Sequence, residues 1–147
     1  MQNLLRREKI EKMNKLNELY TLAQDENINV YCFDLPMTHS MSVCSNGKSY
    51  VALDPFTFNS SAEEIYFLAH ELGHCLTGSF YNRFSEIDIR AKHELRADKW
   101  AIKKLIPKDE LMYAFEHGVI EPWDLAEYFD VTEDFILKAV EYYKYCA

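Results

Sequence analysis

Glycine, proline and cysteine are scarce in this sequence, with four residues of each type among 147. Their scarcity excludes collagen-like, proline-rich and disulfide-dense architectures. The cysteines lie far apart and form no CxxC pair, which excludes a zinc ribbon and a thioredoxin-type redox motif. No stretch approaches the ~20 apolar residues of a membrane span, and the first residues lack the apolar core of a signal peptide. We therefore expect reduced thiols, no membrane partner and a cytoplasmic protein.

Positive charge is the minority sign. Sixteen Lys and Arg residues stand against 24 Asp and Glu residues, a formal net charge of −8. Binding to nucleic acid needs clustered positive charge that neutralises phosphates, so we expect no nucleic-acid partner. The length and the 48% share of hydrophobic residues fit one globular domain with its own core.

The first half of the chain predicts one helix and a small sheet. Apolar residues at three- and four-residue intervals indicate an amphipathic helix over residues 4–23. β-Branched and aromatic residues predict a strand over 28–33, and a hairpin is predicted with strands at 41–44 and 49–53 and a turn at 45–48. We expect these strands to form a small, mostly antiparallel sheet.

The second half predicts helices only. Ser60 precedes Glu63 by three residues, and Ser61 precedes Glu64 by three, so either pair can form the capping box of a helix that ends near Gly78. The later helices are expected at residues 89–106, 109–117, 122–129 and 133–145. Strands early in the chain and helices late in it define an α+β fold.

The most informative motif is His70-Glu71-Leu72-Gly73-His74, an HExxH sequence inside the first of these helices. Residues four apart on a helix lie about 40° apart around the axis and ~6 Å apart along it, so both imidazoles can bind one metal ion. Glu71 is rotated by about 100° from His70 and can act as a general base toward a water molecule at the metal. The motif predicts a zinc site with His70 and His74 as ligands and Glu71 as the catalytic residue.

A third ligand is expected on the next helix, about twenty residues further on. Glu94 supplies a carboxylate there, and Asp98 lies one turn beyond it on the same face. Asp98 can then accept the free ring N–H of a ligand histidine and orient that ring. His93 is the alternative third ligand, but we favour Glu94 because adjacent helix residues diverge by about 100° and only Glu94 has Asp98 one turn on.

These motifs resemble those of the ImmA/IrrE family of metallopeptidases. The specific part of the resemblance is HELGH at residues 70–74 and ExxAD at residues 94–98. A strand at 49–53 and a helical segment at 124–135 are also similar, so the resemblance covers roughly residues 28–140.

The resemblance implies a zincin-type core and a zinc-dependent endopeptidase of the gluzincin type. The positions that match His70, His74 and Glu94 bind zinc in that family, and the one that matches Glu71 is catalytic. The implied substrate is a helix-turn-helix repressor of a phage or mobile element. The implied organisation is a single metallopeptidase domain over 1–147, with an N-terminal helix at 1–27, the catalytic core at 28–107 and a C-terminal helical segment at 108–147. We expect the stand-alone form, because 27 residues are too few for the N-terminal helix-turn-helix domain that many members carry.

The sequence leaves two features of the implied peptidase mechanism undetermined. The donor that holds the substrate oxyanion is one of His39, Tyr81, Arg83 and His93, and nothing in the sequence selects among them. The strand at 50–53 is a candidate to pair with an extended substrate, as sheet edges commonly do.

Two other functions compete with peptidase activity. A regulatory binding protein on a peptidase fold would act as an anti-repressor by sequestering its partner without proteolysis. A DNA-binding regulator would use the C-terminal helices, whose apolar spacing is similar to a helix-turn-helix. Residues 105–147 hold three lysines against ten acidic residues, so DNA phosphates would be repelled, whereas a basic repressor domain would be attracted.

Overall fold

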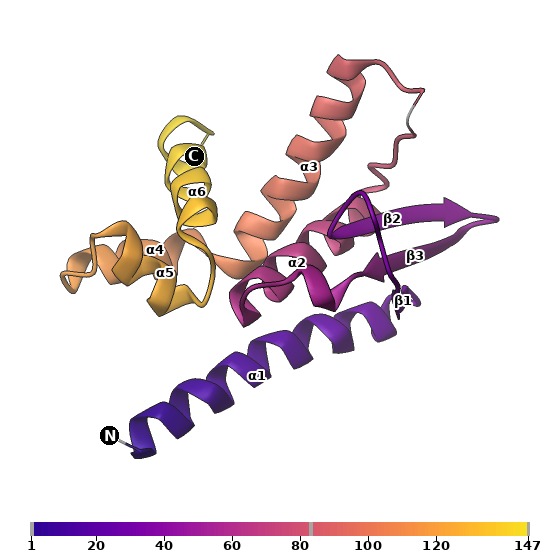
Figure 1. The fold of residues 1–147 in the computed structure, drawn as a ribbon. Helices are drawn as coiled ribbons and strands as arrows, with labels where there is room; N and C mark the ends of the chain where they lie inside the picture. Colours follow the sequence, from indigo (N-terminus) through magenta and orange to yellow (C-terminus); the bar gives the residue numbers. More distant parts are fainter. Residues whose placement is uncertain (1, 83, 147) are drawn as a thin grey trace.

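The computed structural model describes residues 2–82 and 84–146 and has the expected α+β fold (Figure 1). The elements are α1 (Gln2–Asp25), β1 (Asn29–Cys32), β2 (Ser40–Ser45), β3 (Lys48–Leu53), the short 3-10 helix η1 (Pro55–Thr57), α2 (Ser61–Thr77), α3 (Ile87–Leu105), α4 (Lys108–Glu116), α5 (Pro122–Phe129) and α6 (Glu133–Cys146). Among the described residues, no helix is long and apolar enough to cross a membrane.

β3 lies in the middle of the sheet, between β1 and β2. It pairs antiparallel with β2 across a two-residue turn at Asn46 and Gly47, whose φ angles of 53° and 74° suit the twist of a tight hairpin. β1 pairs with β3 in parallel, so the expected mostly antiparallel sheet is wrong and the sheet is mixed. The reason is that the chain crosses between residues 33 and 39 to the far side of β3. It then reverses at the hairpin, which brings β3 back in the direction of β1.

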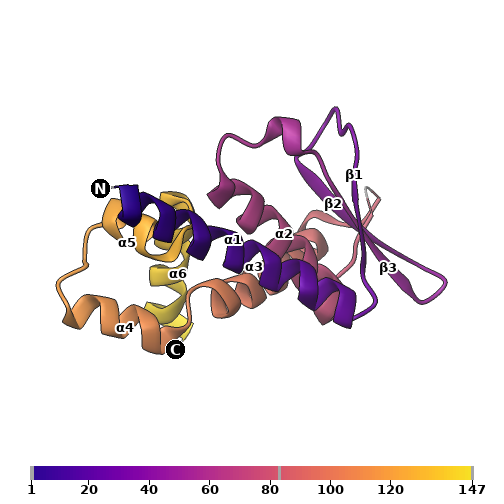
Figure 2. The ribbon, with the colours of Figure 1, turned by 90° about the horizontal axis from the view of Figure 1, so that it is seen from below.

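The sheet buries one face and exposes the other. Side chains alternate along a strand, and Val51 and Leu53 on the buried face are each 1% exposed. On the opposite face Tyr31, Met41 and Val43 are between 43% and 48% exposed. α2 packs against β2 and β3, and Figure 2 shows the helices gathered on one side of the sheet. α2 is therefore enclosed between the sheet and the other helices.

α2 begins and ends at its capping residues. The Oγ atom of Ser60 accepts a hydrogen bond of 3.2 Å from the backbone N–H of Glu63, so the first of the two expected capping pairs forms. The carboxylate of Glu63 accepts from the backbone N–H of Asn59 at 2.8 Å. Gly78 closes the helix with a φ of 65°, and its N–H donates to the carbonyl oxygen of His74. These caps place the HExxH motif in the last, buried turns of α2.

α2 and α3 cross in close backbone contact at Gly73. A Cβ atom at this position would lie 2.6 Å from the carbonyl oxygen of Ala97 on α3. Glu94 and Asp98 flank Ala97 on α3, so the crossing determines how far their carboxylates stand from α2.

Replacing Gly73 with Ala should lower the free energy of unfolding by about 1–3 kcal/mol, because the added methyl group must push the two helices apart. Helix propensity alone predicts the opposite sign, a gain of roughly 1 kcal/mol. Urea unfolding followed by circular dichroism measures the difference. A variant more stable than the wild type would contradict the close crossing.

α1 runs beside the C-terminal helices in both views (Figures 1 and 2). The Nζ atom of Lys15 donates to the backbone carbonyl oxygens of Leu105 and Phe129, which are the last residues of α3 and α5. A cation at the C-terminal ends of two helices is favoured by their dipoles. One cluster of buried side chains extends from Leu19 of α1 to Ala139 of α6, so α1 and the C-terminal helices share a core.

Candidate metal centre

His70 and His74 on α2 and Glu94 on α3 converge on one point. The Nε2 atoms of the two histidines lie 3.2 Å apart. The Glu94 carboxylate lies 2.8 Å from Nε2 of His70 and 3.2 Å from Nε2 of His74. The three ligand atoms all lie within 4.8 Å of one another, which makes the group able to hold a metal ion. The structure therefore brings together the three residues that the motifs predict as ligands.

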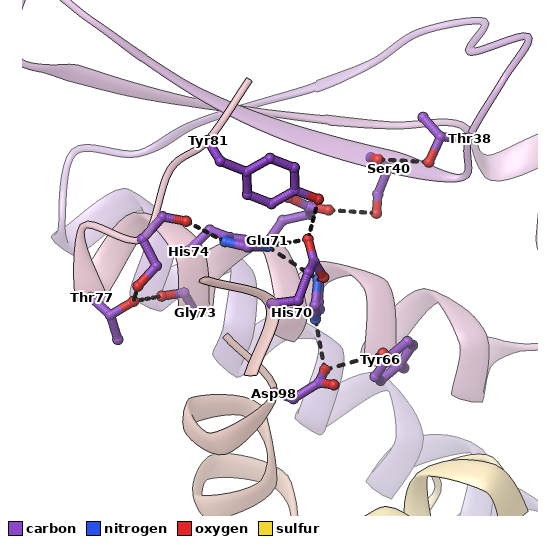
Figure 3. Close-up of polar contacts among 12 residues, drawn as sticks. Thr38, Ser40, Tyr66, His70, Glu71, Gly73, His74, Thr77, Tyr81 and Asp98 are labelled. Atoms are coloured by element: carbon purple, nitrogen blue, oxygen red, sulfur yellow. Dashed lines mark hydrogen bonds and ion pairs between the residues drawn. The ribbon is translucent and has the colours of Figure 1, made fainter. Parts of the chain in front are cut away.

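The other ring nitrogen of each histidine is held by an acceptor (Figure 3). Nδ1 of His70 lies 2.8 Å from Oδ1 of Asp98, and Nδ1 of His74 lies 2.6 Å from the backbone carbonyl oxygen of Ser79. Both acceptors require a proton on Nδ1. In the neutral rings the lone pairs are then on the Nε2 atoms that face Glu94, as metal ligation needs.

Asp98 is bound from three directions. Besides His70, the hydroxyl of Tyr66 donates to its Oδ1 at 3.2 Å, and the Nζ atom of Lys138 on α6 donates to its Oδ2 at 3.2 Å. The sequence predicted the contact of Asp98 with a ligand histidine, but it pointed to neither Tyr66 nor Lys138. These contacts hold the Asp98 carboxylate in one orientation, and through it the His70 ring.

Glu71 lies on the same helix but faces the sheet. Glu71 is 5% exposed, and its Oε1 atom accepts a hydrogen bond of 2.8 Å from the hydroxyl of Ser40 on β2. Figure 3 shows the Glu71 carboxylate next to the metal-ligand group, with Ser40 on its other side. Sequence reasoning missed Ser40, because a serine thirty-one residues away carries no local signal of this contact.

Tyr81 is the oxyanion-donor candidate whose polar atom reaches the ligand group. Its hydroxyl donates to Oε1 of Glu94 at 2.5 Å. The His93 ring stacks on Tyr81 with centroids 6.3 Å apart and lies outside the ligand group, and its buried Nδ1 has no hydrogen-bond partner among the described residues. The His39 ring stacks on Phe67 at 4.8 Å. The fourth candidate, Arg83, lies outside the described residues.

β3 does not have the free edge that pairing of residues 50–53 with a substrate requires. Both edges of β3 are occupied, one by β1 and one by β2. That expectation is therefore wrong, because the sequence did not indicate the crossover that puts β3 in the centre. The sheet edge beside Glu71 belongs to β2, through Ser40.

Acidic side chains predominate around the ligand group. Burial lowers the pKa of His70, but its hydrogen bonds to Asp98 and Glu94 and the charge of Glu71 outweigh burial and raise that pKa from 6.5 to about 10. Burial raises the pKa of Glu94 and of Asp98, but their hydrogen bonds and neighbouring positive charges, those of His70 first, together outweigh burial and lower both pKa values below the usual range. Two carboxylates with lowered pKa values beside two histidines form a site that a divalent cation fits.

Asp98→Asn should weaken metal binding about 10–100-fold, because the amide keeps the shape of the side chain but loses the negative charge that orients and polarises His70. Competition with a fluorescent chelator measures the affinity. Asp124→Asn, at an exposed position on α5, is the matched control and should leave the affinity unchanged. Equal metal affinities in the two variants would show that Asp98 does not contribute to metal binding.

Comparisons of the chain with protein-family models, with curated proteins and with solved structures return no match. The two motifs and the geometry that they adopt are therefore the features that point to a function.

Proposed function

We propose that this protein is a zinc-dependent endopeptidase of the gluzincin type, with a zincin-type core like that of the ImmA/IrrE family. The observation that carries the proposal is the convergence of His70, His74 and Glu94 within 4.8 Å, with the Glu71 carboxylate beside them. The three ligands would be enough for a protein that only binds a metal ion. A buried glutamate next to the ligand group is the additional feature that hydrolysis requires.

The donor set fits zinc. Two imidazole nitrogens and one carboxylate oxygen, with the fourth position open, form the ligand set of a catalytic zinc site. When bound there, zinc supplies Lewis-acid activation of a water molecule and of the scissile carbonyl group. His70, His74 and Glu94 would hold it, and Asp98 and the Ser79 carbonyl would orient the two imidazoles.

Glu71 carries the proton transfers in this proposal. Its carboxylate accepts a proton from the attacking water and later delivers it to the leaving amine. The hydrogen bond from Ser40 occupies Oε1 and leaves Oε2 for the proton. Because Ser40 lies on the edge strand β2, an extended peptide that adds to this edge would pass close to Glu71.

Tyr81 is the proposed donor to the substrate oxyanion. Burial and the adjacent Glu94 carboxylate raise the pKa of Tyr81 to about 12, so its hydroxyl keeps the proton that it would donate. Its hydrogen bond to Glu94 places that hydroxyl at the ligand group, where charge develops during hydrolysis.

Tyr81→Phe should lower kcat about 100-fold with little change in KM and with full metal content, because the lost hydroxyl acts only on the developing charge. Tyr128→Phe, at an exposed position on α5, is the matched control. Steady-state cleavage of a peptide substrate measures both constants. A variant with wild-type kcat would assign the oxyanion to another donor.

A helix-turn-helix repressor of a phage or mobile element is the proposed substrate. The family resemblance supports this class, and so does charge, since the C-terminal segment has three lysines against ten acidic residues and would attract a basic DNA-binding domain. A narrow substrate range follows, so digestion of casein is not an informative assay.

The test is incubation of the purified protein with such a repressor, followed by mass spectrometry of the products. We expect cleavage at one or a few bonds, loss of cleavage with the chelator 1,10-phenanthroline, and recovery when zinc is added. Cleavage that persists after complete removal of metal, or an intact repressor in the presence of the zinc-loaded protein, would overturn the proposal.

A further inference from the structure

A cavity of about 300 Å³ lies beside the metal-ligand group, between α2, the residues before β2 and the start of α6. Its volume is at the low end for a ligand site and suits one long side chain. Aromatic rings form much of its wall: Tyr66, Phe67, Phe135 and the ring of His39. Phe67 stacks on His39 with centroids 4.8 Å apart, and Tyr66 packs against Phe135 at 4.9 Å. Phe58 also stacks on Phe67 at 5.4 Å, and the Nζ atom of Lys138 lies 5.9 Å from the centroid of the Tyr66 ring. The rings therefore offer apolar contact to the methylene groups of an entering side chain.

The charged groups of the cavity are acidic in balance. Glu63 and Asp134 line it together with Lys138. The Lys138 cation is already paired with Asp98, and the Glu63 carboxylate accepts hydrogen bonds from the neutral Asn59. Asp134 is exposed in the first turn of α6. A positively charged side chain that enters the cavity therefore meets two carboxylates that have no cationic partner among the described residues.

The cavity adjoins the catalytic group through two of its wall residues. The Tyr66 ring lies 5.8 Å from the ring of His70, between centroids. His39 directly precedes Ser40, whose hydroxyl holds the Glu71 carboxylate. A peptide whose backbone passes the general base would thus bring one of its side chains to the cavity.

We propose that this cavity is a specificity subsite that takes a lysine or arginine side chain of the substrate. The proposal rests on the peptidase function proposed above and adds a substrate class to it: peptides with a basic residue near the scissile bond. Recognition combines apolar contact between the methylene groups of that side chain and the aromatic wall with attraction of its charge by the carboxylates of Glu63 and Asp134.

The first experiment profiles cleavage of a synthetic peptide library. At one subsite we expect lysine or arginine to be preferred about tenfold over norleucine, which has a similar length and no charge. Asp134→Lys should reduce this preference to about twofold or less. Glu133→Lys is the matched control, because it makes the same charge change in the same helical turn at a residue that does not line the cavity, and it should keep the preference.

The second experiment measures binding without turnover. Zinc-loaded protein with Glu71→Gln is titrated with an acetylated pentapeptide that carries a central lysine, and with its norleucine counterpart, while amide NMR signals are recorded. We expect the lysine peptide to shift signals of Thr132, Asp134 and Phe135, and the norleucine peptide to leave them in place. Adding Asp134→Lys to the same protein should abolish the shifts.

The outcomes separate the subsite from the peptidase function. Cleavage without a basic preference, or a preference that Asp134→Lys leaves intact, overturns the subsite and keeps the peptidase. Protein that binds no zinc and cuts no peptide overturns the peptidase function, and the same NMR titration carried out without zinc still decides the cavity. Equal binding of the two pentapeptides overturns the subsite.

Discussion

Glu71→Gln should lower the rate of peptide cleavage about 10³-fold while the metal content stays at the wild-type level. The amide keeps the size of the side chain and can still accept a hydrogen bond from Ser40, but it cannot take a proton from water. Mass spectrometry of the repressor fragments measures the rate, and elemental mass spectrometry measures the metal. Retained metal separates this variant from one that has lost the site.

Glu116→Gln is the control for this variant, because it makes the same change at an exposed residue near the end of α4. It should cleave at the wild-type rate. The Glu71→Gln and Glu116→Gln variants together also decide between a peptidase and an anti-repressor that sequesters its partner. If Glu71→Gln relieves repression in cells as well as the wild type does, proteolysis is unnecessary and the binding-protein function is favoured.

His70→Ala should remove the metal. We expect about one zinc ion per chain in the wild type and an affinity at least 100-fold weaker in the variant, since one of three ligands is gone. Elemental mass spectrometry of the two proteins, purified identically and supplied with zinc, measures the stoichiometry. Zinc binding to the wild type should also release about one proton per ion near neutral pH, because the pKa of His70 is raised to about 10 before the metal arrives.

His117→Ala is the matched control for the metal measurement. This histidine is exposed at the end of α4, where its Nδ1 lies 2.8 Å from the carbonyl oxygen of Tyr113. The variant should keep the full zinc content. Equal zinc in all three proteins would place the ion elsewhere, and no zinc in the wild type would overturn the peptidase proposal in favour of the binding protein.

The helices were predictable because their signals are local. α2 was expected from the capping serine to Gly78 and spans Ser61–Thr77, since caps and apolar periodicity act within a few residues. α5 begins at Pro122, as a first-turn proline requires. α3 was expected at 89–106 and spans Ile87–Leu105, an offset of up to two residues at its ends.

Part of the site was predictable for the same reason. The i, i+4 spacing of His70 and His74 places both imidazoles on one helix face whatever the rest of the fold does. The choice of Glu94 over His93 also followed from helix geometry, because only Glu94 shares a face with Asp98. These relations are set within one helix each.

The tertiary structure alone decided how the two helices meet and what surrounds them. The contact of Gly73 with Ala97 positions α3, β2 brings Ser40 to Glu71, and α6 brings Lys138 to Asp98. These contacts join residues between 24 and 40 positions apart, and a single sequence carries no local pattern for such pairs. The crossover that makes the sheet mixed also lacks a local sequence pattern. Sequence by itself determined which residues can act as ligands and as base, because helix periodicity is short-ranged. Packing determined the partners of these residues and the distances between them, because packing depends on the whole chain.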